Sequence, residues 1–283
     1  DDAQGEFIYK YVSSAIYSKD TPPDNLLDEG TLFVAKFHSD KRGQWLPLTP
    51  ETTGLKEAAE VCVYTRVAGS AVKATPMDRP EWICARPGTS EVYCSLTNNV
   101  RRGLGRNLAG EKMVLDGPNP RTGNKYGQIL RLKAKNNDHC SDEFDWDLYL
   151  VAGNPLVHED EYRGSTNIKE SNMFNGPDGL RFDSQDRLWI QTDGDTSNSG
   201  EFLGQGNNQM LVGNPNTGEI RRFLTGPRGC EITGLCWNED RTAMFVGIQH
   251  PGENSPSEFP DGKGYSPRSS VIVVTHNDGN EIG

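Results

Sequence analysis

The chain repeats one local pattern three times: an acidic residue, a short apolar segment, a polar turn and a second apolar segment. The acidic residues are Glu81, Asp178 and Glu231, and the second apolar segments read EVYCSL, RLWIQT and AMFVGI. A repeated strand–turn–strand unit decides the architecture, because each copy must bury its apolar face against its neighbours. If the three hairpins are equivalent blades around one axis, their acidic residues lie at equivalent places near that axis.

The same three acidic residues predict a metal site. Carboxylates brought together repel one another unless a cation neutralises them, and hard cations such as Ca²⁺ take oxygen ligands. Asp178 alone could instead stabilise its own Gly-Pro-Asp-Gly turn through the backbone. Glu231 stands between Cys230 and Ile232 at a strand start, where a buried carboxylate needs a partner. We therefore predict that Glu81, Asp178 and Glu231 bind Ca²⁺ at the centre of a β-propeller.

Each acid-led hairpin is followed by two further strand candidates, which makes four strands per unit, the blade pattern of a propeller. In the third unit the fourth candidate is only a terminal stub, NEIG. Helical spacing and enrichment in Ala and Glu predict one inserted helix. Three and a half blades do not close a ring, so we expect about half of a larger propeller, or a smaller one completed by flanking segments. The predicted all-β chain is a single domain over 1–283, with a blade remnant at 1–50, a helix at 54–75 and blades at about 79–155, 175–226 and 229–283.

Charge and composition argue against several classes of function. The formal net charge is −11 and the sequence pI is near 5.0, which argues against a nucleic-acid or anionic-membrane surface. No run of apolar residues is long enough to span a bilayer. No export signal opens the chain, so we expect any signal to have been removed or to lie outside this sequence.

The six cysteines leave the redox compartment open. None shows the Cys-x-x-Cys spacing of a zinc ribbon. Cys84 and Cys94 are placed symmetrically about the first hairpin turn, so they could form a disulfide across it in an oxidising compartment. Two buried free thiols explain the same spacing equally well.

The constellation Asp78-Arg79-Pro80-Glu81 is the strongest candidate for chemistry. Residues two apart in an extended segment face the same side, so Arg79 and Glu81 can both address the channel. The planar guanidinium of Arg79 matches phosphate or carboxylate oxygens. The alternative is a local surface ion pair between Arg79 and Asp78.

Further candidates stand at the ends of the second hairpin strands and could complete a cation shell or merely cap strands and turns. Long loops at 98–126 and 249–267 follow two inner hairpins, and we expect both to hang over one end of the channel. The strand-end candidates are Asn98, Asn99, Asp193, His250 and Glu253.

At these residues the chain resembles the PhoX-type alkaline phosphatases. The matching stretches include DRPEW, GPDGLRFDSQDRLWIQTDGD, GPRGCEITG and IQHPGE, and they span most of the chain. The resemblance implies a six-bladed β-propeller, of which this chain looks like the C-terminal half. It also implies a periplasmic or secreted protein that hydrolyses phosphomonoesters to phosphate with calcium and iron (Fe³⁺).

Carried over position by position, the resemblance implies that Glu81, Asp178 and Glu231 are metal ligands, chiefly for calcium, and that Arg79 holds the substrate phosphate. Gln128 stands where the family tends to have His. The family's N-terminal half supplies an iron-binding cysteine and further acidic ligands. We therefore expect weak hydrolysis by residues 1–283 alone, and either a monomer or a chain that pairs with an N-terminal half.

Two other functions are compatible with parts of the pattern. NGPDGL followed by LW also resembles calcium-dependent gluconolactonase-type propellers, which use one Ca²⁺ to activate a water and need no phosphate-clamping arginine. A non-catalytic propeller scaffold with structural calcium is the third reading. Activity assays distinguish the three functions. A phosphatase hydrolyses a phosphate ester, a lactonase hydrolyses a lactone, and a scaffold hydrolyses neither.

Overall fold

The computed structural model describes residues 2–20 and 26–283, and the fold is all-β, built from three antiparallel sheets. The first sheet has seven strands in the order β1-β2-β3-β7-β6-β5-β4. Its N-terminal part joins the following four-stranded meander where β3 pairs with β7. The strands of this sheet are β1 (Tyr9–Ser13), β2 (Gly30–Phe37), β3 (Arg42–Leu48), β4 (Pro80–Ala85), β5 (Glu91–Leu96), β6 (Gln128–Ala134) and β7 (Glu143–Val151).

The second and third sheets are simple meanders. The second has the order β11-β10-β9-β8 and the third the order β12-β13-β14. Their strands are β8 (Pro177–Phe182), β9 (Leu188–Thr192), β10 (Gln209–Gly213), β11 (Ile220–Thr225), β12 (Glu231–Trp237), β13 (Ala243–Gln249) and β14 (Ser270–Thr275).

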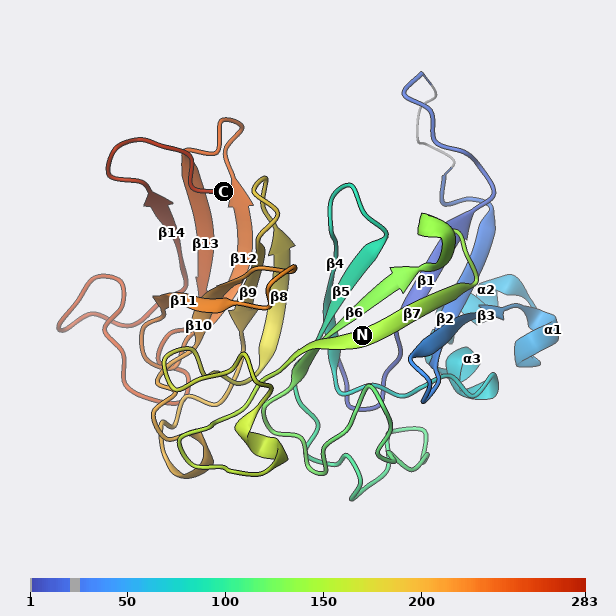
Figure 1. Cartoon of the computed structure of the whole chain (residues 1–283), viewed down its shortest axis with the longest axis horizontal. Helices are drawn as coiled ribbons and strands as arrows, with labels where there is room; N and C mark the ends of the chain where they lie inside the picture. The colour runs from blue at the N-terminus through green and yellow to red at the C-terminus, as the bar shows by residue number, and fades with distance from the viewer. Residues whose placement is uncertain (1, 21–25) are drawn as a thin grey trace.

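The sheets lie next to one another in chain order, with β1–β7 on the right of Figure 1 and β8–β14 on the left. The first strand of each acid-led hairpin is the inner one, since β8 contacts both β4 and β12. The predicted all-β fold is confirmed, and its arrangement is that of a partial β-propeller. Strands β4–β7, β8–β11 and β12–β14 fall within 79–155, 175–226 and 229–283.

Burial along the strands follows their place in the sheets. All five residues of β9 are buried, as in a strand covered on both faces. Outer strand β14 alternates, with Val271 and Val273 exposed. The fourth strand expected at NEIG does not form. Ile282 packs on the core of the third sheet and donates its backbone N–H to the Arg241 carbonyl.

The helical region is divided. In place of one helix over 54–75, the structure has α1 (Pro50–Thr53), α2 (Ala58–Val63) and α3 (Thr65–Ala71). The break is at Tyr64, whose φ and ψ of −105° and 42° are not helical. The β-branched Val61, Val63 and Thr65 around it lose side-chain freedom in a helix, which weakens propagation. No helix in the described part of the chain is long and apolar enough to cross a membrane.

The first hairpin separates Cys84 from Cys94. In the observed register Cys84 pairs with Tyr93 and Cys94 with Ile83, so the two thiols point to opposite faces of the sheet. All six cysteines are free. Of the two readings that the sequence left open, the structure therefore has the free thiols, with Cys94 buried and Cys84 half-buried.

Apolar packing joins neighbouring sheets. Tyr93 of β5 makes edge contacts with the rings of Phe182 and Tyr149, at centroid distances of 5.2 and 5.3 Å. These rings belong to one buried cluster that also contains Leu188 and Leu211 of the second sheet. A second cluster joins Trp189 and Met210 of the second sheet to the third sheet. The sheets thus share cores and do not stand as separate units.

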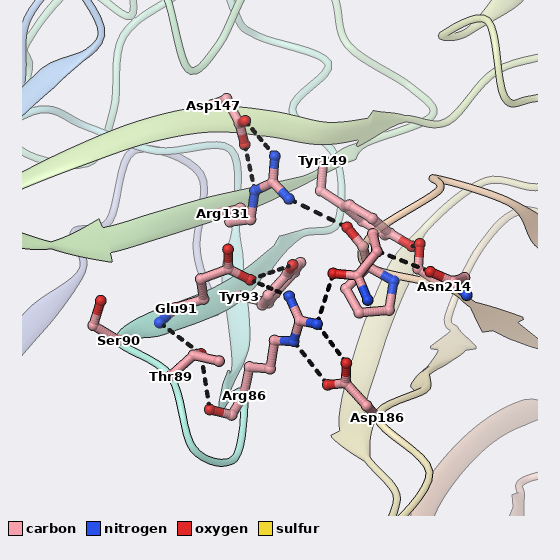
Figure 2. A network of polar contacts seen from close by, with 12 residues as sticks. Arg86, Thr89, Ser90, Glu91, Tyr93, Arg131, Asp147, Tyr149, Asp186 and Asn214 are labelled. Carbon is pink, nitrogen blue, oxygen red and sulfur yellow. Dashed lines mark hydrogen bonds and ion pairs between the residues drawn. The ribbon is translucent and has the colours of Figure 1, made fainter. Parts of the chain in front are cut away.

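A network of polar contacts lies at the interface between the first and second sheets (Figure 2). Arg86, just after β4, pairs with Asp186 in the β8–β9 turn and donates to Glu91 (2.9 Å) and Asn216 (2.8 Å). Arg131 of β6 forms a two-point ion pair with Asp147 of the neighbouring strand β7. The contacts of Arg86 bridge two sheets, and they lie at the opposite end of β4 from Glu81.

We predict that Arg86→Ala lowers the free energy of unfolding by about 2 kcal/mol. The arginine is 11% exposed, and its loss removes several charge-assisted hydrogen bonds and leaves Glu91 without its cation. Urea denaturation measures the change. Arg221→Ala is the matched control, because the Arg221–Glu219 pair is 73% and 55% exposed and should contribute less than about 1 kcal/mol. Equal losses in the two variants would contradict a bridging role.

Candidate functional site

The three repeat acids begin the three inner strands. Glu81 is the second residue of β4, Asp178 the second residue of β8, and Glu231 the first residue of β12. The pairing register shifts between Pro80 and Ile83 and between Pro177 and Leu180, so Glu81 and Asp178 each lie in a β-bulge. Bulges re-aim side chains at sheet ends. In the third hairpin the shift comes later, between Thr233 and Leu235.

Arg79 lies among these acids. Its guanidinium is 3.8 Å from a Glu81 carboxylate oxygen and 4.0 Å from an Asp193 oxygen. It also donates two hydrogen bonds to Asp2, at 2.6 and 3.0 Å. The expected facing of Arg79 and Glu81 is observed, although the backbone at Arg79 is left-handed (φ 54°) and not extended. The alternative pairing of Arg79 with Asp78 is not formed.

The acids act on one another electrostatically. Burial, followed by the negative charges of Glu231 and Asp193, raises the pKa of Asp178 to about 7. Burial, the hydrogen bond with Asp2 and the charge of Asp178 raise the pKa of Glu81 to about 8, against a smaller lowering by Arg79. The strands that these acids begin are neighbours, since β8 contacts both β4 and β12. Glu81, Asp178 and Glu231 therefore lie at the same end of three adjacent inner strands.

Residues at the end of β13 complete this side of the site. Gln249 donates to a Glu231 oxygen at 2.8 Å, and His250 Nε2 is 3.4 Å from the same oxygen. His250 Nδ1 is 3.4 Å from Glu253. Burial and the charge of Asp193 raise the pKa of Glu231. Of the strand-end candidates, Asp193, His250 and Glu253 therefore join the acid cluster.

Asn99 does not join it. The backbone of Asn99 pairs with Asn124, and its side chain accepts the N–H of Arg101 and donates to Met113 Sδ. Asn99 thus organises the loop over 98–126. The Asn99 side chain is an interior polar group of this loop and does not face the acids.

A fully buried ion pair supports the backbone of Arg79. Asp78 and Arg102 have 0% exposed side chains and are joined by a hydrogen bond of 2.7 Å. Arg102 also donates to the carbonyl of Pro76. Asn124 donates to the other Asp78 oxygen at 2.9 Å. A non-glycine residue in the left-handed region costs free energy and persists where its surroundings over-determine it. The pair formed by the preceding residue supplies that constraint.

Gln128 belongs to the same interior network. Its side chain accepts from Asn124 at 2.6 Å and donates to the carbonyl of Pro118 at 3.0 Å, with Asp78 at 3.4 Å. It is completely buried. The glutamine thus satisfies polar groups behind Asp78, and both its oxygen and its nitrogen form hydrogen bonds there.

The carboxylates have the chemistry of a hard-cation site. No group of three His, Cys, Asp or Glu side chains among the described residues is drawn together as a formed metal site. The Asp178 Oδ1 atom is nevertheless buried and without any hydrogen-bond partner. A buried carboxylate oxygen of this kind costs free energy until a donor or a cation reaches it. The oxygen donors therefore fit Ca²⁺ in kind.

Sequence reasoning missed Asp2 and Arg102. Asp2 lies far along the chain from Arg79 and belongs to no repeat, so no local signal marks it as a partner. Arg102 is one of several basic residues in a glycine-rich loop. Only the return of that loop beneath Asp78 distinguishes it from its neighbours.

We predict that Arg102→Met lowers the free energy of unfolding by about 3–5 kcal/mol, because it leaves the buried Asp78 charge unpaired. Chemical denaturation measures the loss. The double variant Asp78→Asn, Arg102→Met should recover part of it, since no buried charge then remains. A double variant as unstable as the sum of both single variants would show that the charge is not the cause.

We predict that, without metal, the free energy of unfolding falls as pH rises from about 4 to about 8. The ordinary pKa values of Glu81 and Asp178 are 4.5 and 3.8, and the folded values are about 8 and about 7. The folded chain therefore holds protons that the unfolded chain has released, and this stabilisation is lost as pH rises through the folded values.

Urea midpoints in EDTA at pH 5 and pH 8 measure this dependence. The double variant Glu81→Gln, Asp178→Asn should show a much smaller difference between the two pH values. Calcium added at pH 8 should raise the wild-type midpoint by binding the folded state, and should raise that of the variant much less. Identical pH profiles for both proteins would rule out mutual repulsion.

The geometry agrees with comparisons to known proteins. The model of the family "Alkaline phosphatase PhoX" matches residues 1–252. A solved structure, Pseudomonas fluorescens PhoX in complex with vanadate, a transition state analogue, is similar to the chain with 49% sequence identity and a TM-score of 0.93. The match covers 100% of this chain and 51% of that chain, so this chain spans about half the length of that relative.

No match is found among curated proteins. The family match extends over all three acid-led hairpins up to residue 252, and the structural match includes every strand of the three sheets. On this sequence and structural agreement, the chain belongs to the PhoX family of alkaline phosphatases.

Proposed function

We propose that the chain forms the phosphate-clamping and calcium-binding side of a phosphomonoester hydrolase. The observation that carries the proposal is Arg79 in contact range of Glu81 and Asp193, beside the buried Asp178 and Glu231. Arg79 is surrounded by carboxylates that repel a dianionic phosphate ester. It can bind such an ester only when further cations neutralise these carboxylates. The family membership supports the same chemistry.

The reaction joins a water oxygen to phosphorus and breaks the phosphorus–oxygen bond of the ester, giving an alcohol and inorganic phosphate. Arg79 would hold two phosphoryl oxygens through its planar fork. Asp2 now occupies that fork with two hydrogen bonds, which supports its fit to an oxyanion. The left-handed backbone fixed by Asp78 would keep the guanidinium aimed at the acids.

Glu81, Asp178 and Glu231 would hold calcium, with Asp193 at the edge of the site. Bound cations would neutralise phosphoryl charge and polarise the phosphoryl group. Gln249 and His250 would orient Glu231 from the β13 side. Calcium is the cation that we propose for these carboxylates, because all three offer oxygen donors.

Iron requires other ligands as well. The family resemblance implies an iron-binding cysteine that the family's N-terminal half supplies. We propose iron binding only together with ligands that these residues do not supply. The relative's complex with vanadate, a transition state analogue, supports phosphoryl transfer as the reaction of the family.

The comparisons lend no support to the lactonase or scaffold alternatives. The resemblance also leads us to propose that the protein is periplasmic or secreted. Its partners would be a phosphomonoester and inorganic phosphate.

We predict that Arg79→Ala, in the protein at its full natural length, lowers kcat/KM for p-nitrophenyl phosphate about 100- to 1,000-fold, the cost of removing one oxyanion-stabilising group. The melting temperature in calcium should change little, since the arginine's proposed partner is the substrate. The assay uses calcium and iron at alkaline pH. Arg221→Ala serves as the control for loss of a surface arginine.

Unchanged turnover in Arg79→Ala would refute the clamp. A lactone assay on the same samples tests the alternative chemistry, because lactone hydrolysis that survives Arg79→Ala without phosphatase activity would refute the proposed function.

A further inference from the structure

A polar cavity of about 670 Å³ adjoins the acid cluster. It lies where β9 and β13 end and β10 and β12 begin, and Asp193, His250 and Glu253 line it. Asp193 is 4.0 Å from Arg79, and His250 is 3.4 Å from Glu231. The cavity and the proposed phosphate clamp therefore share a wall. Its volume suits a small-molecule ligand.

The walls of the cavity select against apolar ligands. Among the described residues that line it there is no Ala, Val, Leu, Ile, Met, Phe, Tyr or Trp. Hydroxyl and amide groups come from Thr196, Ser197, Asn207, Asn254 and Ser255. A large aliphatic group would find little apolar surface here, whereas a small polar group can form hydrogen bonds throughout.

Arg228 is the one Lys or Arg among the described lining residues, and it forms no ion pair with a carboxylate in the described ranges 2–20 and 26–283. Its backbone is held firmly, because Gly252 donates its N–H to the Arg228 carbonyl at 2.8 Å. At Gly229 (φ 61°), an added Cβ would lie 3.2 Å from Ser255 Oγ. The backbone of this loop is thus fixed against the residues after β13, and Arg228 itself is exposed.

The charges in the cavity are divided. Asp193 and Glu253 lie toward the clamp, where Arg79 and His250 lie against them. Asp195 is a third carboxylate in the lining. Arg228 supplies positive charge on the part of the wall formed by residues 228–230, which precede Glu231 in the sequence. A guanidinium fork prefers a carboxylate or phosphate to a neutral hydroxyl.

We propose that this cavity is the leaving-group subsite and that Arg228 binds a second oxyanion, a carboxylate or a phosphate, on the alcohol part of the substrate. The inference rests on the proposed function. The preferred substrates are then phosphomonoesters of small hydroxy acids or bisphosphates, with one phosphoryl group at Arg79 and the second anion at Arg228.

The experiment compares matched substrates on the protein at its full natural length. Glycerol 3-phosphate and 3-phosphoglycerate differ only in a hydroxymethyl group replaced by a carboxylate. Fructose 6-phosphate and fructose 1,6-bisphosphate test a second phosphate in the same way. We expect Arg228→Ala to lower the kcat/KM ratio of the anionic to the neutral substrate about 10- to 100-fold, mainly through KM, the loss expected for one charge-assisted hydrogen bond. Arg228→Lys should retain part of the preference.

Arg163→Ala is the matched control, because Arg163 is exposed and lies outside the cavity. An unchanged substrate ratio in Arg228→Ala would overturn the proposal, as would the same drop in Arg163→Ala. A drop with only one substrate pair identifies whether carboxylate or phosphate is the anion. If the protein hydrolyses neither compound, the proposed function is refuted but the subsite can still be tested. Calorimetry in calcium then compares the binding of 3-phosphoglycerate with that of glycerol 3-phosphate, and the subsite predicts tighter binding of 3-phosphoglycerate that Arg228→Ala removes.

Discussion

Negative charge is concentrated where the inner strands β4, β8 and β12 begin, and burial makes that charge costly. Glu81, Asp178 and Glu231 each take a raised pKa from burial together with neighbouring carboxyl groups. An arrangement of this kind weakens the fold unless a proton, an arginine or a cation balances it. Functional sites are where proteins retain such a cost. The position of Arg79 within this cluster follows from the same need for positive charge.

The inner strand β4 carries different interactions at its two ends. At its start, Arg79 and Glu81 face the acid cluster, held from behind by the buried pair of Asp78 and Arg102. Past its other end, Arg86 bridges to Asp186 in the next sheet (Figure 2). The bridge and the shared apolar cores hold neighbouring sheets together, so the strand starts keep their mutual positions. Rigid elements of this kind are what a site of several ligands requires.

The architecture could be predicted because its signals are local. Each hairpin combines two apolar runs with a polar turn, and these decide strand formation within about twenty residues. The helix prediction was less accurate, because the β-branched residues around Tyr64 oppose the helical spacing that the apolar positions suggest. Cys84 and Cys94 do not face each other because the hairpin register places Cys84 opposite Tyr93 and Cys94 opposite Ile83. A difference of one residue in register reverses the face of a side chain, and spacing alone does not reveal it.

The sequence by itself determined that an acidic residue begins each of three hairpins and that an arginine stands two residues before the first acid. These are properties of neighbouring residues, and the regular geometry of a strand fixes where such residues lie relative to one another. Only the tertiary structure decided which charges meet. Arg79 pairs with Asp2, 77 residues away, and Asp78 with Arg102, 24 residues away. The polar cavity beside Arg228 likewise needs loops from two sheets. Such contacts depend on how the sheets pack and where the loops return. The sequence contains many distant residues of suitable charge for each partner, and only the packing determines which of them come into contact.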